Sequence, residues 1–178
     1  NELLSGLKNL GIPNSKIVLY DYHFSHACLS FYPSPFDESL VLVASGRGDF
    51  RSTTLWEAKR NEGLSLISQT SELSSLGSMY GSITKLLGFT PNRHEGKVTG
   101  LAAKGNPSAI LERLSDSIGF NKELGRINAK IGDFYKPFNS STPQGMVEMI
   151  SELNREDFAF AAQFVLEQSL VELVSHYL

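Results

Sequence analysis

Two kinds of apolar pattern follow one another along the chain. In the first part, short runs of apolar and β-branched residues predict strands at residues 16–20, 39–44, 53–59 and 64–70. The last two are separated by Asn61-Glu62-Gly63, which is a hairpin-length connection, and residues 46–49 supply a turn before them. The sequence therefore predicts an antiparallel meander of three strands, preceded by a separate strand at 16–20.

The other apolar residues recur with a helical period. They predict helices at residues 3–10, 23–32, 75–87, 98–104, 108–118 and 157–178. Gly11, Pro33, Gly88 and Gly105 follow four of these segments and are typical of helix ends. Residues 125–144 are less regular and predict only a short strand near 127–131. Strands in a meander followed by several helices indicate an α/β or α+β layer.

Length and composition indicate one ordinary globular domain, residues 1–178. The chain has 41% hydrophobic and 20% charged residues, and no apolar run approaches the roughly 20 residues that a membrane helix needs. Its net charge is −3 and its Lys and Arg residues are scattered, which argues against a nucleic-acid partner. A single cysteine and the lack of a signal-peptide pattern favour a reducing cytoplasmic setting. Because both ends fall inside helical patterns, we expect a piece of a longer protein, truncated at both ends.

The first candidate site is the histidine-containing segment Tyr22-His23-Phe24-Ser25-His26-Ala27. His23 and His26 are three residues apart, so on a helix they face the same side, where two imidazoles can share a metal ion. A pair of histidines is also compatible with a structural, hydrogen-bonded pair. The segment alone leaves both interpretations open.

Two glycine-containing segments are the other candidates. Ser45-Gly46-Arg47-Gly48-Asp49 offers backbone N–H groups that can approach an anion, although the same residues are compatible with a plain tight hairpin. In Glu95-Gly96-Lys97-Val98-Thr99-Gly100-Leu101-Ala102, the start of the helix predicted from Val98 favours an anion. Lys97 lacks the spacing of a P-loop lysine, and Glu95 with Lys97 can also be a solvated pair.

In their order and spacing, the three segments resemble the carbamoyltransferase family of antibiotic and nodulation-factor biosynthesis. That family carries a histidine-rich segment, an Asp-Gly-x-Gly-Glu turn and a Glu-Gly-Lys-x-x-Gly-Leu-Ala helix in the same order. The resemblance implies an α/β fold with a ribonuclease-H-like, actin-like ATPase lobe of the actin and sugar-kinase superfamily. The present chain would be a central, partial piece of it, with an antiparallel meander and several flanking helices.

The resemblance also assigns roles to single residues. In the family, two histidines four residues apart and the aspartate of the turn hold an iron-type divalent metal, and these positions are Tyr22, His26 and Ser45 here. Only His26 keeps a metal-ligating side chain, because a neutral serine hydroxyl is a poor ligand for a divalent ion. The predicted catalytic residues are His23, His26 and Lys97, and the predicted substrate-binding residues are Gly46, Arg47, Gly48, Asp49, Glu95 and Gly96.

The function implied by the resemblance is carbamoyl transfer. The intact parent would move a carbamoyl group from carbamoyl phosphate, through carbamoyl-adenylate, to a hydroxyl of a small-molecule acceptor, with ATP and a divalent metal as cofactors. Missing parts of the parent chain would complete the site, so we expect this piece alone to be inactive. The alternatives are a degenerate, metal-free binding or scaffolding member of the same fold and a nucleotide-binding kinase or ATPase relative.

Overall fold

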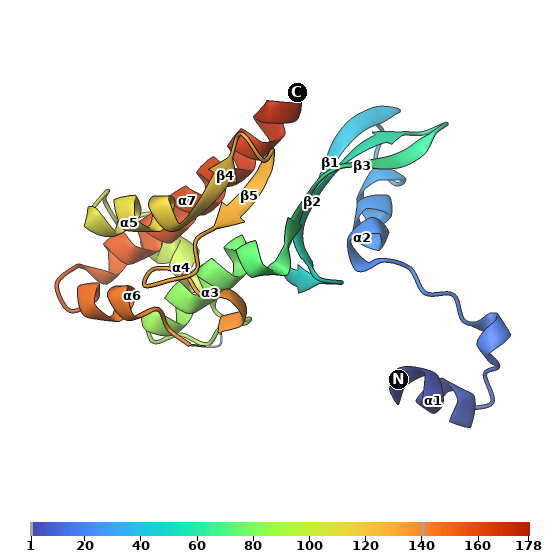
Figure 1. The fold of residues 1–178 in the computed structure, drawn as a ribbon, viewed down its shortest axis with the longest axis horizontal. Helices are drawn as coiled ribbons and strands as arrows, with labels where there is room; N and C mark the ends of the chain where they lie inside the picture. Colours follow the sequence, from blue (N-terminus) through green and yellow to red (C-terminus); the bar gives the residue numbers. More distant parts are fainter. Residues whose placement is uncertain (1, 140) are drawn as a thin grey trace.

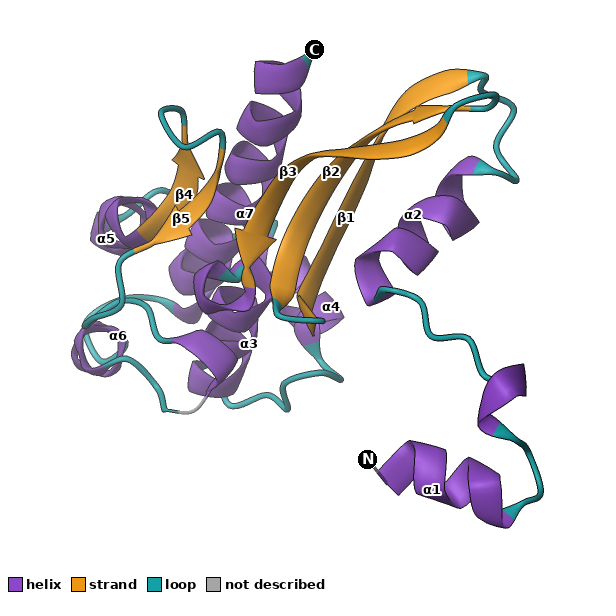
Figure 2. Ribbon diagram, turned by 45° about the vertical axis from the view of Figure 1, so that its right-hand side comes forward, coloured by secondary structure: helices purple, strands orange, loops and turns teal. Residues whose placement is uncertain are grey.

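A computed structural model describes residues 2–139 and 141–178 and shows an α/β arrangement around two antiparallel sheets (Figures 1 and 2). The larger sheet has the order β1-β2-β3 and the smaller one pairs β4 with β5. The strands are β1 (Glu38–Gly48), β2 (Arg51–Lys59), β3 (Gly63–Ser71), β4 (Ile118–Asn121) and β5 (Arg126–Ala129). The helices are α1 (Glu2–Asn9), α2 (Tyr22–Phe31), α3 (Leu76–Leu86), α4 (Glu95–Ala102), α5 (Ala109–Ser117), α6 (Gln144–Met149) and α7 (Arg155–Tyr177), with short 3₁₀ turns η1 (Asn14–Lys16), η2 (Glu72–Ser74) and η3 (Pro137–Asn139).

The larger sheet is covered on both faces because side chains alternate along β1. Val41 and Val43 are buried on the face that α2 covers, in a small core that also includes Phe31 and Trp56. Leu42, on the opposite face, packs against the larger core instead. In Figure 2, α2 lies on one side of the sheet and α3 and α7 lie on the other. The sheet thus separates two apolar clusters of unequal size.

The larger core is built around α7. Phe158, Ala161, Ala162, Val165 and Leu173 recur on one side of this helix and are at most 3% exposed. By length and composition, α7 is the one helix in the described part of the chain that could cross a membrane. Its buried stripe packs against α3, α4, α5 and β4, which is the position of a core helix.

Hydrogen bonds between side chains and backbone groups join the two sheets. The N–H of Ile127 donates to Thr70 Oγ1 (3.2 Å), that of Ala129 donates to Ser74 Oγ (3.1 Å), and Ser68 Oγ donates to the carbonyl of Gly125 (2.7 Å). Side chains of β3 and η2 therefore satisfy backbone groups of the β4–β5 hairpin that its own ladder leaves free. The hairpin is fixed beside β3 without a continuous ladder between the two sheets.

Helix caps position α2 and α3 against the sheet. Asp21 Oδ1 accepts the N–H of Phe24 at 2.8 Å and begins α2. Ser75 Oγ accepts the N–H of Ser78 at 3.0 Å and begins α3, and the same hydroxyl donates to the carbonyl of Gly46 at 2.6 Å. One buried serine thus starts α3 and attaches it to β1.

The meander and the helices near 3–10, 23–32, 75–87, 108–118 and 157–178 are confirmed, and three predictions were wrong. The strand predicted at 16–20 does not form, because no neighbouring strand lies along it in the described chain. Lys16 belongs to η1, and Val18, Leu19 and Tyr20 are 67–70% exposed. The β1–β2 turn falls at Asp49 and Phe50, with φ of 47° and 64°, so that of the predicted turn residues 46–49 only Asp49 belongs to it. Helix α4 begins at Glu95 and not at Val98. The short strand β4 and helix α6 were not predicted.

Candidate functional site

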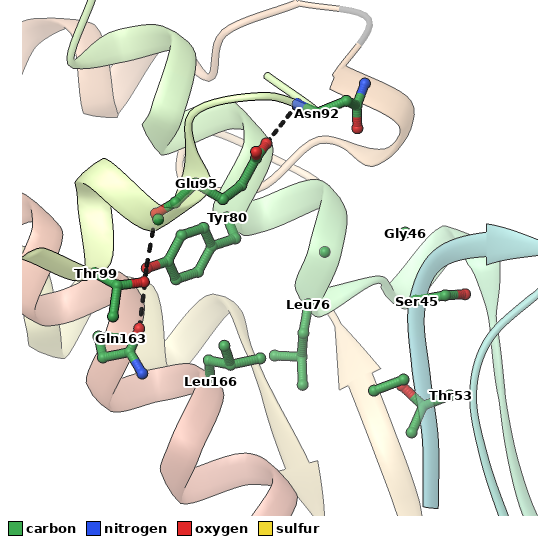
Figure 3. A pocket seen from close by; sticks show the side chains of 13 residues that line it. Ser45, Gly46, Thr53, Leu76, Tyr80, Asn92, Glu95, Thr99, Gln163 and Leu166 are labelled. Atoms are coloured by element: carbon green, nitrogen blue, oxygen red, sulfur yellow. Dashed lines mark hydrogen bonds between the residues drawn. The ribbon is translucent and has the colours of Figure 1, made fainter. Parts of the chain in front are cut away.

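A pocket of about 440 Å³ opens between the end of β1 and the helices α3, α4 and α7 (Figure 3). Gly46 lies on the β1 side, and Glu95 and Gly96 lie at the start of α4, so three of the predicted substrate-binding residues meet here. Leu76 of α3 and Leu166 of α7 supply apolar surface. Convergence of several elements on a concave, partly apolar surface is typical of a small-molecule site.

Gly77 explains how α3 comes close enough to β1 to form this pocket. A Cβ at position 77 would lie 2.8 Å from Cα and 2.9 Å from N of Gly46. Both contacts are with backbone, which cannot rotate away as a side chain can. Glycine at the first turn of α3 is therefore needed for the observed approach of helix and strand.

Tyr80 organises the polar side of the pocket. Its hydroxyl donates to Gln163 Oε1 at 2.9 Å and lies 2.9 Å from Thr99 Oγ1, so one phenol joins α3, α4 and α7 (Figure 3). Burial raises the pKa of Tyr80, the Thr99 hydrogen bond lowers it, and the nearby carboxylates of Glu95 and Glu167 raise it further. Tyr80 is thus held as a neutral phenol that fixes its neighbours.

The pocket lining carries little charge. Within the described chain, Glu95 is the only lining residue with a formal charge at neutral pH, and its Oε1 accepts the backbone N–H of Asn92. A negative, hydrogen-bond-accepting wall suits a neutral or cationic ligand with hydroxyl groups better than a phosphate. The basic residues predicted for this site lie outside its lining.

Lys97 and Arg47 each lie over an aromatic ring. Lys97 Nζ is 5.6 Å from the centroid of Phe89, and Arg47 Cζ is 5.8 Å from the centroid of Phe138. Neither residue lines the pocket that Gly46, Glu95 and Gly96 share. The structure therefore does not bring the predicted catalytic lysine together with the pocket.

The histidine segment lies on the opposite face of the sheet, at the start of α2. His23 is fully buried, with Nδ1 3.1 Å from Thr54 Oγ1 and Nε2 3.4 Å from Ser45 Oγ. Burial is the main cause that lowers the pKa of His23. In Figure 3, the Ser45 hydroxyl points away from the pocket, in keeping with its contact to His23. The Ser45 hydroxyl is thus directed toward His23 and not into the pocket.

Tyr22 fills the space between α2 and the β1–β2 turn. Its ring centroid is 4.4 Å from that of His26 and 5.5 Å from that of His23, both in edge-on geometry. A Cβ on Gly48 would overlap this ring. Asp49 Oδ2 accepts the backbone N–H of Tyr22 at 2.7 Å. Gly48 and Asp49 therefore contact α2 and not the pocket.

The residues at this end of α2 do not fit a metal ion. In the described part of the chain, no group of three His, Cys, Asp or Glu side chains is close enough to hold one. Of the three positions that the resemblance assigns to the metal, only His26 carries a strong ligand.

Sequence reasoning missed the polar side of the pocket, which consists of Tyr80, Asn92, Thr99 and Gln163. Tyr80 falls on the apolar stripe of its helix, which is the pattern of a core residue, and it is only 6% exposed. Gln163 interrupts the apolar pattern between Phe160 and Phe164, and this was the one signal in the sequence. Its pairing with Tyr80, 83 residues earlier, is set by the packing of α7 on α3.

Known proteins resemble this chain over nearly its whole length. The family model described as carbamoyltransferase N-terminus matches residues 3–177. An uncharacterized protein of Methanocaldococcus jannaschii is 32% identical over 98% of this chain and 32% of the relative. The nodulation protein NolNO of Sinorhizobium fredii is 37% identical over 64% of this chain and 17% of the relative. The chain spans about a third or less of the length of these curated relatives. On the match across residues 3–177, the chain belongs to the carbamoyltransferase N-terminus family.

Proposed function

We propose that this chain forms the substrate-binding lobe of a carbamoyltransferase. The intact protein would transfer a carbamoyl group from carbamoyl phosphate, by way of carbamoyl-adenylate, to a hydroxyl of a small molecule. The observation that carries the proposal is the family match over residues 3–177. The three-stranded meander with helices on both faces is compatible with one part of a ribonuclease-H-like, actin-like ATPase lobe, which we include in the proposal.

Within this function, the pocket beside Gly46 suits the acceptor. The Glu95 carboxylate is able to accept a hydrogen bond from an acceptor hydroxyl and to orient its oxygen for attack on the carbamoyl carbon. The apolar surface of Leu76 and Leu166 suits the body of a small molecule. Because the same carboxylate repels phosphate, we assign the charged groups of carbamoyl phosphate and ATP to surfaces outside this pocket.

The test uses the full-length protein with ATP, carbamoyl phosphate and a panel of hydroxyl-bearing acceptors. Formation of carbamoyl-adenylate releases pyrophosphate, so we expect exchange of labelled pyrophosphate into ATP that depends on carbamoyl phosphate. Glu95→Gln should raise the KM for the acceptor about tenfold or more and leave the exchange unchanged, because it removes one charge-assisted hydrogen bond. Glu112→Gln, a change at an exposed acidic residue in the first turn of α5, is the matched control.

Each outcome favours one interpretation. Exchange with a selective effect of Glu95→Gln supports the proposal. Production of ADP and a phosphorylated acceptor would identify a kinase relative instead. Binding of an acceptor without exchange or transfer would identify a binding or scaffolding member, which is the alternative that Tyr22 and Ser45 favour because they replace the family's metal-ligating histidine and aspartate.

A further inference from the structure

We propose that the face of the sheet where α2 meets the β1–β2 hairpin binds no divalent cation, and that contacts centred on Tyr22 hold α2 to the hairpin without one. The family resemblance serves only to locate the ion at positions 22, 26 and 45. The inference does not depend on carbamoyl transfer. It rests on the donors, the carboxylates and the space at this end of α2.

The side chains at the three positions are unsuited to a cation. Position 22 carries a phenol, and its ring packs edge-on against His26 with 4.4 Å between centroids. Position 45 carries a neutral hydroxyl, which lies 3.4 Å from Nε2 of His23. Both ring nitrogens of His23 face hydroxyls, Thr54 on one side and Ser45 on the other, and the ring is fully buried. His26 is therefore left without a second strong donor.

The nearby carboxylates are already engaged in holding the helix. Asp49 Oδ2 accepts the N–H of Tyr22 at 2.7 Å. Asp21 accepts the N–H of Phe24 with one oxygen and pairs with Arg51 at 2.9 Å through the other. Two acidic residues thus satisfy free N–H groups at the start of α2 and connect it to both sides of the β1–β2 turn. A cation here would compete with these hydrogen bonds.

The Tyr22 ring also occupies the space between α2 and the end of β1. The Tyr22 ring lies so close to Gly48 that a methyl group at position 48 would overlap its Cδ1. The remaining hollow on this face, about 430 Å³, is lined by Tyr20, Tyr22, Ser25, His26, Leu29 and Asp49 and is open to solvent. The ring, the Asp49 hydrogen bond and the Asp21–Arg51 pair together connect α2 to the hairpin.

The first experiment measures metal content and thermal stability of the chain. We expect no stoichiometric Fe²⁺, Co²⁺ or Zn²⁺ after reconstitution, and an unfolding temperature that neither EDTA nor added Co²⁺ changes. Tyr22→Ala should lower the unfolding temperature by about 3–6 °C, whereas Tyr22→Phe should leave it unchanged because the packing against His26 and Gly48 is made by the ring. Tyr20→Ala, at a tyrosine that is 70% exposed, is the control.

The second experiment restores the ligands. Tyr22→His together with Ser45→Asp gives two histidines four residues apart on one helix face and a carboxylate on the adjacent strand. We expect this variant to bind Co²⁺ about a hundredfold or more tightly than the parent chain, with the absorption of a Co²⁺–imidazole complex and a raised unfolding temperature when Co²⁺ is present. Tyr32→His with Ser65→Asp makes the same chemical changes at distant exposed positions and should show no such gain.

Three results would overturn the proposal. The first is about one ion per parent chain, lost on His26→Ala. The second is a fall in the unfolding temperature of the parent with EDTA. The third is a folded Tyr22→His/Ser45→Asp variant that binds Co²⁺ no better than the control pair, which would mean that Tyr22 and Ser45 are not what excludes the ion. If the double variant fails to fold, the proposal is still tested by the metal content of the parent chain and by the unfolding temperatures of Tyr22→Ala and Tyr22→Phe.

Discussion

Gly46 and Gly48 look alike in the sequence but have different surroundings in the structure. A Cβ at Gly48 would overlap the Tyr22 ring, whereas a Cβ at Gly46 would meet nothing within 4 Å. We expect Gly48→Ala to lower the free energy of unfolding by about 1–3 kcal/mol through overpacking, and Gly46→Ala to change it by less than about 0.5 kcal/mol. Denaturant unfolding of the two variants measures this difference.

A double variant shows whether the Tyr22 ring causes the effect. If the added methyl group is harmful only because the ring is there, Gly48→Ala should cost much less in a Tyr22→Ala background. An equal cost in both backgrounds would assign the effect to the strand backbone and would contradict the packing seen here.

At the scale of single residues, the structure divides the predicted substrate-binding residues between two places. Gly46, Glu95 and Gly96 do line a pocket. Gly48 and Asp49, from the same motif, contact Tyr22 instead, because a β-bulge between Ala44 and Gly48 and a turn at Asp49 and Phe50 separate them from Gly46. Local spacing contains no information on which face of a sheet a side chain takes after a bulge.

At the scale of the helices, replacing a glycine by alanine in α3 and in α4 should change the free energy of unfolding in opposite directions. Gly77→Ala should destabilise the fold by about 1–3 kcal/mol, because its Cβ would be 2.8–3.1 Å from backbone atoms of Ser45 and Gly46. Gly100→Ala, inside α4 with nothing within 4 Å, should stabilise it by about 0.5–1 kcal/mol through helix propensity. Denaturant unfolding of both variants should therefore give shifts of opposite sign.

The Gly77 variant has a second readout in the pocket. An alanine there would force α3 away from β1 and change the backbone around Gly46, so amide chemical shifts of residues 44–46 should move. They should not move in Gly100→Ala. A stabilised Gly77→Ala chain would show that α3 and β1 are not in the close contact described.

Helices and strands were predicted well where the apolar period was strong. They were predicted poorly where the element is short or depends on pairing with another segment of the chain. α3, α7 and the three strands of the meander follow from their own sequence, with bounds within two residues of those observed except at the end of β1, which extends from the predicted Ala44 to Gly48. Residues 17–20 have the composition of a strand, yet a strand forms only when a neighbour pairs with its backbone, and the described chain provides none. β4 was missed because Ile118-Gly119-Phe120-Asn121 is too short to show a period and continues directly from α5.

At the scale of the whole molecule, Tyr135 connects the irregular loop before α6 to the start of α3. Its hydroxyl donates to the carbonyl of Leu73 at 2.9 Å and accepts the N–H of Ser75 at 2.8 Å, and the residue is 1% exposed. Ser75 in turn holds Gly46 through its side chain. One buried phenol thus supports the contact between helix and strand beside which the pocket lies.

This phenol should make stability depend on alkaline pH. Burial, partly offset by the hydrogen bond from Ser75, raises the pKa of Tyr135 to about 12, against an ordinary value of 10.0. Above pH 10 the unfolded chain releases this proton and the folded chain does not, so the contribution is complete below pH 10 and is lost as the pH rises toward 12. Two pKa units correspond to about 2–3 kcal/mol.

We expect Tyr135→Phe to lower the free energy of unfolding by about 1–3 kcal/mol at pH 7, because the N–H of Ser75 and the carbonyl of Leu73 lose their partner. Between pH 9 and 11, the free energy of unfolding of this variant should then change less than that of the parent chain. Denaturant unfolding across this pH range measures both effects. Tyr32→Phe, at an exposed tyrosine, should follow the parent curve, and a Tyr135→Phe curve parallel to the parent would show that this phenol is not the group that titrates.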